Sequence, residues 1–419
     1  MTEQQNTPEL RFSEFKSVWK KDKLGTLIEN NTILNQSDGN HGSLYPRKSE
    51  FINSGIPYIS ASNIKNNEID FSNVKYLEME RAKQFKKGVA QNEDVLLAHN
   101  ATVGPTALLK TEYPFVILST TLTLYRLNKD NLNNHYFLYS LQSKNIQNQL
   151  TKLMKQTTRN QVPILLQRKM ILTYPLDLAE QEKIGNFFSK LDRQIELEEK
   201  KLELLEQQKK GYIQKIFSQE LRFKDENGNN YPNWEMKKLG NIANIVGGGT
   251  PSTKKSEYWD GDINWFSPVE IGDKEFVSTS QRRITEKGLE KSSAKMLPIG
   301  TVLFTSRAGI GKTAILSKEA TTNQGFQSIV PKENDLDSYF LYSMTSILKR
   351  NAEKVGAGST FSEVSRKQME QIKLLIPILK EQKQIGRLFQ IINRKINKQI
   401  HKIELLKQRK KGLLQKMFV

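Results

Sequence analysis

Two long stretches of the chain place apolar side chains at alternating steps of three and four residues, with polar residues between them. A 3.5-residue apolar period sustained over more than four heptads keeps one stripe facing a partner, so it predicts two long helices joined along a coiled-coil seam. The predicted seam positions are Ile184, Phe188, Leu191, Ile195, Leu202, Leu205, Tyr212 and Ile216 in the first helix, and Ile385, Phe389, Ile392, Ile396, Ile403, Leu406, Leu413 and Met417 in the second.

Polar residues interrupt the two tracks at matching places, Glu198 and Lys209 in the first and Gln399 and Lys410 in the second. The alternative is an amphipathic helix that lies only on its own domain, and this alternative leaves the matched interruptions unexplained. The stretch KKGYIQKIF at 209–217 returns as KKGLLQKMF at 410–418, at a shift of 201 residues.

The repeat extends over most of the chain, which indicates one unit written twice. The matched blocks are Glu9-Leu-Arg-Phe12 with Glu220-Leu-Arg-Phe223, Trp19 with Trp234, Tyr136-Phe-Leu-Tyr-Ser140 with Tyr339-Phe-Leu-Tyr-Ser343, Gly104 with Gly311, and Glu180-Gln181 with Glu381-Gln382. The shift decreases from 215 near the start of each copy to 201 at its end, so insertions fall between the blocks. We predict globular segments at 1–177 and 220–376, and long helices at 178–219 and 377–419.

Each globular segment alternates short apolar runs with helical patterns. Runs at 94–98, 116–118 and 300–304 read as strands bounded by Gly, Asn and Pro, and helical patterns follow at 136–154 and 336–355. The expected fold class is therefore α/β (α+β). The expected architecture is two similar globular domains separated by a long antiparallel two-helix coiled coil, with a pseudo-twofold internal repeat. The antiparallel direction follows from the short route between the end of the first helix and the second globular segment.

Composition narrows the class of partner. The 419 residues carry a formal net charge of +19 and an isoelectric point near 9.6, which favours binding to a polyanion such as nucleic acid. The opposing interpretation is that the lysines only solubilise long helices. The absence of cysteine excludes disulfides, thiolate zinc sites and cysteine nucleophiles. With no apolar run long enough to span a bilayer and no secretion signal, we expect a cytoplasmic protein.

Three stretches imitate catalytic or ligand-binding motifs. Residues 306–313, SRAGIGKT, resemble a phosphate-binding loop, but Ser306 stands where that loop requires glycine. Residues 225–236 lack the glycine and glutamate of a calcium loop. Gly247-Gly-Gly-Thr250 lacks the spacing of a dinucleotide fingerprint and is interpreted as a flexible loop. The four histidines have no metal-ligand spacing, so we expect no metal and no catalysis by this chain.

The order of the motifs, repeated twice, resembles the specificity subunit of bacterial type I restriction–modification systems over nearly the whole chain. The motifs are the Trp-x3-Lys-Leu-Gly openings, the Glu-Gln-x2-Ile-Gly helix starts, the stretch GTVLFTSRAGIGK at 300–312, and Asn323-Gln-Gly-Phe326. The first copy departs from this wording, with Asn100-Ala-Thr-Val-Gly104 and Ser119-Thr-Thr-Leu122 in the corresponding places.

The resemblance implies that 1–177 and 220–376 are target recognition domains, each of which reads one half of a bipartite site in double-stranded DNA. It implies that the helices act as a spacer and dock two methyltransferase subunits, which restriction subunits join. The chain itself would be non-catalytic and bind no cofactor. S-adenosylmethionine, ATP and magnesium would belong to the partner subunits.

Base edges are read by Arg, Lys, Asn and Gln, whereas Ser and Thr suit phosphates. The candidate DNA-binding residues are Arg282, Arg283, Arg307, Lys312 and Gln324 in the second copy, and Arg47, Lys48, Asn63, Asn100 and Thr102 in the first. Two alternatives stay open at this point: a non-specific coiled-coil adaptor, and a stand-alone DNA-modifying enzyme with unusual motifs.

Overall fold

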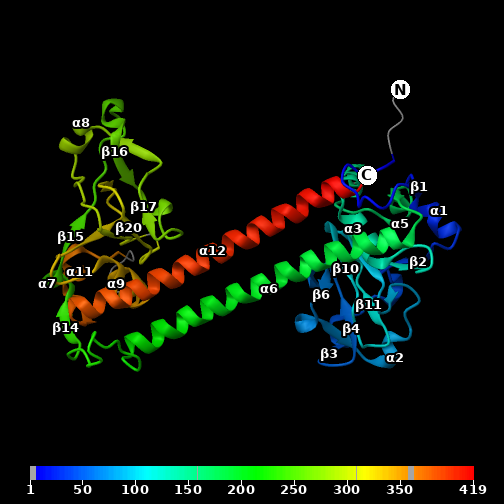
Figure 1. Cartoon of the computed structure of the whole chain (residues 1–419), viewed down its shortest axis with the longest axis horizontal. Helices are drawn as coiled ribbons and strands as arrows, with labels where there is room; N and C mark the ends of the chain where they lie inside the picture. The colour runs from blue at the N-terminus through cyan, green and yellow to red at the C-terminus, as the bar shows by residue number, and fades with distance from the viewer. Residues whose placement is uncertain (1–5, 158, 308, 357–362) are drawn as a thin grey trace. The chain divides into compact units, whose positions relative to one another are not determined.

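The computed structural model describes residues 6–157, 159–307, 309–356 and 363–419, and its contacts divide the chain into two units (Figure 1). Unit 1 comprises Met1–Lys201 and Ile400–Val419, and unit 2 comprises Leu202–Gln399. Each unit therefore contains one globular segment and a part of each long helix, α6 (Leu178–Phe217) and α12 (Leu379–Met417).

In unit 1, one sheet has the strand order β10-β9-β12-β2 and a second has the order β3-β7-β4-β11-β8, while β1 pairs with β13 and β5 with β6. The strands are β1 (Lys20–Lys23), β2 (Ile33–Asp38), β3 (Phe51–Ile52), β4 (Ile56–Ile59), β5 (Ile64–Lys65), β6 (Glu68–Ile69), β7 (Lys75–Leu77), β8 (Val89–Ala90), β9 (Val95–Asn100), β10 (Thr102–Leu108), β11 (Val116–Leu118), β12 (Leu122–Leu127) and β13 (Ile171–Tyr174). The helices are α1 (Leu24–Glu29), α2 (Met79–Ala82), α3 (Asn134–Gln142), α4 (Lys144–Met154) and α5 (Ile164–Gln167).

Unit 2 repeats this topology: β15-β22-β19-β20-β17 corresponds to β2-β12-β9-β10, and β18-β16-β21 to β7-β4-β11. The strands are β14 (Glu235–Lys238), β15 (Ala243–Gly247), β16 (Trp259–Phe266), β17 (Phe276–Val277), β18 (Arg282–Ile284), β19 (Val302–Phe304), β20 (Thr313–Leu316), β21 (Thr321–Thr322), β22 (Gln327–Pro331) and β23 (Lys373–Ile376). The helices are α7 (Leu239–Ile242), α8 (Glu286–Glu290), α9 (Ser338–Ser343), α10 (Thr345–Gly356) and α11 (Arg366–Gln371). The mixed α/β class and the internal repeat are confirmed.

The central strand β9 shows why an unbroken apolar run forms a strand here. Val95 and Leu97 point into the core cluster that contains Trp19, whereas Leu96 and Ala98 point into a second cluster on the other face of the sheet. Successive side chains of a strand alternate between faces, so a strand covered on both sides must be apolar throughout. In β19 of unit 2, Val302 and Phe304 likewise face one cluster and Leu303 the other.

The glutamate at each repeated Glu-Gln helix start is buried and accepts hydrogen bonds from several residues, an arrangement called here a buried hub. In unit 1, the carboxylate of Glu180 accepts two hydrogen bonds from Arg11, at 2.6 and 2.7 Å, and one from the indole N–H of Trp19. In unit 2, Glu381 accepts the corresponding bonds from Arg222 and Trp234. A buried carboxylate is tolerated only when it is paired and hydrogen-bonded, which explains why Arg, Trp and Glu recur together.

The next two repeated residues fix each long helix to its own globular segment. The Gln181 side chain donates to Pro175 O and accepts from the backbone N–H of Asn133. One turn along the helix, a Cβ built on Gly185 would lie 2.8 Å from the Cβ of His135, so only glycine permits this approach. Gln382 and Gly386 make the equivalent contacts in unit 2.

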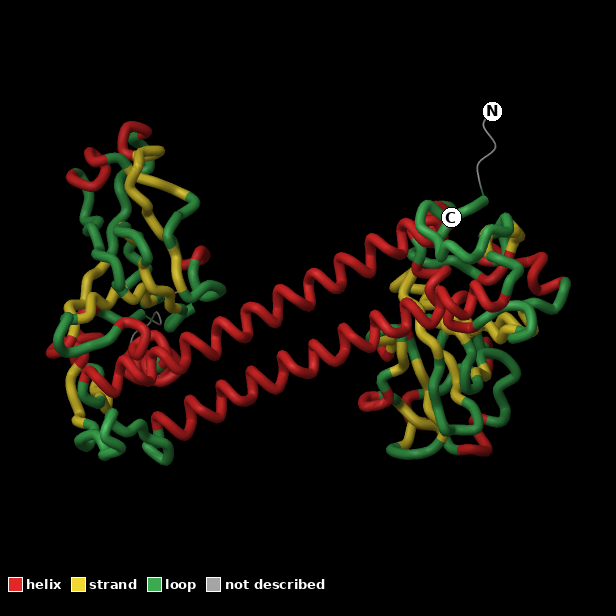
Figure 2. The backbone as a smooth tube through the Cα atoms, in the orientation of Figure 1, coloured by secondary structure: helices red, strands yellow, loops and turns green. Residues whose placement is uncertain are grey.

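The two long helices are continuous (Figure 2), and they run antiparallel to each other within each unit. In unit 1, Lys402 pairs with Glu198, Lys410 with Asp192, and Phe418 packs on Phe188, so residue numbers rise on one helix as they fall on the other. In unit 2, Phe217 stacks on Phe389 with ring centroids 6.3 Å apart.

The residues of the predicted seam lie in these contacts. Eleven of them are buried: Ile184, Phe188, Leu191, Ile195, Ile216, Ile385, Phe389, Ile392, Ile396, Ile403 and Met417. The others are partly buried: Leu202, Leu205, Tyr212, Leu406 and Leu413. How the two units sit relative to each other stays a prediction of the sequence. Among the described residues, no helix is long and apolar enough to cross a membrane.

Candidate nucleic-acid interface

In unit 2, two turns at one end of the β19–β22 sheet bring together Arg307 and Gln324. The N–H of Ser306 donates to Gly325 O at 2.8 Å, and Thr305 bridges to Phe326. The turn that follows β19 therefore lies beside the turn that precedes β22. Gln324 is exposed and Arg307 is half-exposed. These two candidates form part of one surface.

The glycine-rich loop at 247–250 supports the same surface. The N–H of Gly249 donates to Thr322 O at 2.8 Å, and a Cβ built on Gly248 would lie only 1.9 Å from Asn323 O. The hydroxyl of Thr250 donates to the side-chain oxygen of Gln324. The expectation of a flexible loop was wrong, because these glycines permit close backbone packing rather than freedom of the chain.

Arg282 is held against two tryptophans next to this loop. Its guanidinium carbon lies 3.6 Å from the ring centroid of Trp259 and 5.8 Å from that of Trp265. The indole N–H of Trp265 donates to Gly249 O at 2.8 Å, which connects the β16–β18 hairpin to the glycine loop. An arginine stacked on an aromatic face keeps its N–H edge free for a planar acceptor such as guanine.

The remaining two candidates of unit 2 lie differently. Arg283 is exposed and follows Arg282 in β18, so its side chain points to the opposite face of that strand. Lys312 is exposed, and its stem packs over Gly272. It lines a cavity together with Lys209 and Lys349.

In unit 1, Asn100 and Thr102 occupy the turn between β9 and β10, the same place in the fold as Arg307. The amide of Asn100 donates to Thr120 O at 3.3 Å, so this turn also lies beside the one that precedes the last strand of its sheet. Thr102 is exposed. Ala101 between them adopts a left-handed conformation with φ of 63°.

Asn63 is occupied by internal contacts. It is buried, its side-chain oxygen accepts from the N–H of Ser60 at 2.9 Å, and its amide donates to Asn73 O at 3.2 Å. Contact between this side chain and a base would break bonds that shape the 3-10 turn at Ala61–Asn63. Arg47 and Lys48, by contrast, are both exposed at the start of the 3-10 turn Lys48–Glu50.

The sequence reasoning missed several residues of these surfaces. Arg159 is exposed next to Asn160, whose carbonyl accepts from the N–H of Ala101 at 2.9 Å, so it stands beside the Asn100 turn. The polar run Arg159-Asn160-Gln161 after a helical pattern is the signal that could have revealed it. Trp259 holds Arg282 and Thr250 holds Gln324. No sequence pattern marked either Trp259 or Thr250 as part of these surfaces.

Among the described residues, no group of three or more His, Cys, Asp or Glu side chains is placed to hold a metal ion. The exposed cationic and amide side chains gathered at two turns of each unit suit contacts with base edges and phosphates. The chemistry that they offer is hydrogen bonding and charge.

Comparison with known proteins gives a consistent result. The sequence profile of the family described as "Type I restriction modification DNA specificity domain" matches residues 26–207 and again 231–407. The two matches cover both globular segments and most of both long helices.

Two curated relatives and one solved structure illustrate the similarity. The specificity subunit of the type I restriction enzyme MjaIX from Methanocaldococcus jannaschii is 37% identical over 174 residues, which are 41% of this chain and 40% of that protein. The putative MjaX specificity subunit from the same organism is 27% identical over 86% of this chain and 85% of its own length. The S subunit of a type I restriction–modification system from M. genitalium has a TM-score of 0.60 at 16% identity and covers 99% of both chains.

Proposed function

Because this chain belongs to the type I restriction modification DNA specificity family, we propose that it is the subunit that selects the DNA sequence for a methyltransferase and restriction complex. The observation that carries the proposal is the double match of the family profile, once over each unit of the internal repeat. Two similar readers in one chain are what recognition of a bipartite site requires.

In unit 2 the base-reading surface would consist of Arg282, Arg307 and Gln324, with Arg283 at its edge. Support comes from the ties between the elements that carry them: Trp265 joins the Arg282 hairpin to the glycine loop, and Ser306 joins the two turns. The side chains of Arg282 and Gln324, held by Trp259 and Thr250, would lose little freedom on binding, and pre-organisation of this kind favours affinity.

In unit 1 the corresponding surface would consist of Asn100, Thr102 and Arg159, with Arg47 and Lys48 as further contacts. The turn of unit 1 carries the amide of Asn100 and the hydroxyl of Thr102, whereas the equivalent turns of unit 2 carry Arg307 and Gln324. Because arginine favours guanine and asparagine favours adenine, the two units would read different half-sites.

Partner subunits would dock on exposed positions of the long helices, because the seam residues are buried inside the units. Leu204 and Leu405 are 64% and 51% exposed, and they are equivalent under the shift of 201 residues. Two identical methyltransferase subunits need two equivalent surfaces, which the repeat supplies. The docked methyltransferases would bind S-adenosylmethionine, and restriction subunits that join the complex would use ATP and magnesium. The complex would act on DNA in the cytoplasm.

Substitution of the exposed leucines tests this docking surface. We expect Leu204→Lys together with Leu405→Lys to abolish co-purification of the methyltransferase, because each change places a charge in an apolar contact. Leu197→Lys is the control: Leu197 is 50% exposed, but Lys398 stands at the equivalent position, so the repeat offers no matching pair there. Equal loss in the control would refute the assignment.

The proposed function as a whole is tested by gel shifts of the complex with the methyltransferase on a library of duplexes. Retention of a subset that shares two separated sequence elements is the expected outcome. Equal retention of every duplex would favour a non-specific adaptor, and methyl transfer by the purified chain alone would favour a stand-alone enzyme.

A further inference from the structure

Unit 2 contains a cavity of about 440 Å³ where its globular segment meets the long helices. It is lined by residues of α6, β20, α9, α10 and α12, among them Lys209, Lys312 and Lys349. None of its lining residues is acidic. Three lysines around one cavity raise the question of what neutralises them.

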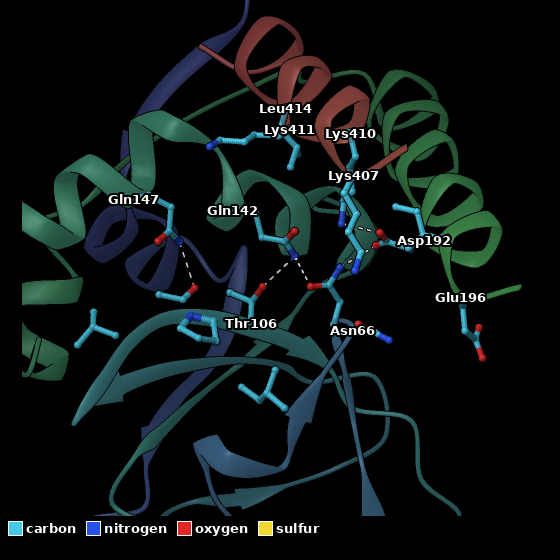
Figure 3. A pocket seen from close by; sticks show the side chains of 16 residues that line it. Asn66, Thr106, Gln142, Gln147, Asp192, Glu196, Lys407, Lys410, Lys411 and Leu414 are labelled. Carbon is cyan, nitrogen blue, oxygen red and sulfur yellow. Dashed lines mark hydrogen bonds and ion pairs between the residues drawn. The ribbon is translucent and has the colours of Figure 1, made fainter. Parts of the chain in front are cut away.

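Unit 1 has a cavity of about 590 Å³ at the equivalent place, and there the lysine equivalent to Lys209 has an acidic partner within the protein (Figure 3). Lys410, the equivalent of Lys209, pairs with Asp192 at 2.5 Å. The hydroxyl of Tyr139 donates to the same carboxylate at 2.7 Å, and the Lys410 ammonium lies 5.2 Å from the ring centroid of Tyr139. Glu196 adds a second acidic residue to the lining.

One of the helices that line the cavities is offset by a residue relative to the matched letters. Asn133 caps α3, and its N–H donates to Gln181; Asp337 caps α9, and its N–H donates to Gln382. Asn133 and Asp337 are therefore structural equivalents. Alignment of the identical letters pairs Tyr139 with Tyr342. Tyr139 lies six residues after its cap, however, and the residue six after Asp337 is Ser343, so Ser343 is the structural equivalent of Tyr139.

Three replacements distinguish the unit 2 cavity from that of unit 1, and two of them change its charge in favour of an anion. Asn393 stands where unit 1 has Asp192, which removes the internal partner of the lysine. Ser343 stands where unit 1 has Tyr139, so the ring and hydroxyl that contact Lys410 and Asp192 in unit 1 have no counterpart there. Finally, the side chain packed against Gly311 is Lys349, whereas Gln147 is packed against the equivalent Gly104.

The donors of the unit 2 cavity are available for a ligand. Neither Lys209 nor Lys312 forms an ion pair with any described residue, and Lys349 is 3.9 Å from Glu353 on the surface. The hydroxyls of Ser343 and Thr345 already donate to backbone carbonyls, whereas that of Ser346 has no partner among the described residues.

Glu275, one of two acidic residues that act on Lys209 electrostatically, is also occupied. Glu275 accepts a hydrogen bond from Tyr339 at 2.6 Å, and Tyr339 in turn accepts from the amide of Asn393. Burial lowers the pKa of Lys209, because its charge is partly removed from water without a paired carboxylate. An anion placed in the cavity would relieve that cost.

We propose that the unit 2 cavity is a binding site for a phosphate group, held by Lys209, Lys312, Lys349 and the Ser346 hydroxyl. This site goes beyond sequence readout by the exposed turns, since it lies at the helices, carries no arginine, and has its one amide, that of Asn393, already donating to Tyr339. Lysine is a point charge that suits phosphate oxygens of any orientation. The phosphate comes either from the DNA backbone or from a free phosphorylated small molecule.

Isothermal titration of the full-length chain with inorganic phosphate tests the site, with chloride adjusted to constant ionic strength. We expect one saturable site. Lys209→Gln and Asn393→Asp should each weaken phosphate binding by about tenfold, because the first removes a charge-assisted contact and the second recreates the internal ion pair of unit 1. Lys407→Gln, which removes an exposed lysine of the unit 1 cavity, should leave phosphate affinity unchanged.

Thermal melting of each variant verifies its fold, and Lys349→Gln replaces any variant that fails to fold. Competition with a short duplex of unrelated sequence identifies the source of the phosphate. If the phosphate comes from the DNA backbone, the duplex displaces inorganic phosphate and Lys209→Gln weakens duplex binding. If the phosphate belongs to a small molecule, Lys209→Gln leaves duplex binding unaffected. Phosphate that binds no better than chloride, or equally well to all variants, overturns the proposal. So does loss of methyltransferase binding in Asn393→Asp with phosphate affinity intact, since the occupant would then be an acidic protein segment.

Discussion

The surroundings of Arg282 distinguish it from the other exposed cations of unit 2. Most of those cations extend into solvent, whereas Arg282 is stacked on Trp259. The neighbouring Trp265 donates a hydrogen bond to the glycine loop and so connects the surroundings of Arg282 to that loop. We propose that Arg282, held in this way, discriminates between bases, because a wrong base would leave its donors unpaired.

Replacement of this arginine tests its role directly. Arg282→Ala should cost about 1–3 kcal/mol on cognate DNA and much less on non-cognate DNA, if it contacts guanine with two hydrogen bonds. Lys318→Ala is the matched control, because Lys318 is an exposed cation just beyond β20, at the end of that strand away from the reading turns. Binding measured by fluorescence anisotropy separates the cases, and equal weakening on all sequences would make Arg282 a phosphate contact.

For single residues, the sequence predicted which residue types and which loops form the exposed surfaces better than it predicted which individual side chains are free to bind. Arg307 and Gln324 were chosen from residue type, and the fold places them on adjacent turns. Asn63 was chosen by the same criterion, but it is buried in a 3-10 turn whose hydrogen bonds have no periodic signature. Trp259 looked like an ordinary core residue until the β16–β18 hairpin placed Arg282 upon it.

Among the elements, the starts of the two long helices concentrate the most costly interactions. The side chain of Glu381 is fully buried and is held by Arg222 and Trp234. We expect Glu381→Ala to destabilise unit 2 by about 3 kcal/mol, because the guanidinium of Arg222 would lose its buried partner. Chemical denaturation measures the loss. Lys416→Ala, which breaks an exposed pair with Glu9, should cost less than about 1 kcal/mol, and equal losses in the two variants would contradict the buried-hub account.

Two buried histidines, His41 and His99, and the half-buried His135 predict an acid sensitivity that is confined to unit 1. Burial lowers the pKa of His41, His99 and His135 below the ordinary value, and unit 2 contains no histidine. Groups whose pKa is lowered on folding contribute stability above their unfolded pKa, near 6.5, and this contribution is lost as the pH falls further.

Hydrogen exchange read by mass spectrometry can follow the two units separately. As the pH falls from about 7 to about 5, unit 1 should lose protection before unit 2, after correction for intrinsic exchange rates. Simultaneous loss in both units would mean that the histidines do not control acid stability.

The helices show which features the periodicity of the sequence predicts and which it does not. The heptad tracks predicted both long helices, and the predicted start of the first, at residue 178, coincides with the start of α6. The five identical letters from Tyr136 and from Tyr339 indicated the same structure, yet the caps Asn133 and Asp337 set their helices one residue apart. Such an offset is fixed by tertiary hydrogen bonds to Gln181 and Gln382, so identical letters could not reveal it.

For the whole molecule, the internal repeat is the property from which the proposed function follows. The strands that the two units share lie in the same order, and the family profile matches both. In the proposed function, divergent turns on a common topology would give two readers with different preferences, and covalent linkage would make the second binding event intramolecular. The joint affinity then exceeds that of either reader when both half-sites are present at the correct spacing.

The central claim is that this chain alone chooses a bipartite DNA sequence. The most direct test maps methylated bases across the genome of cells that produce the chain with its methyltransferase, in the wild type and in the Arg282→Ala, Arg307→Ala double variant. The account predicts one motif of two separated halves, of which only one half becomes degenerate in the variant. A motif that lacks a second half, or one unchanged by the variant, would contradict it.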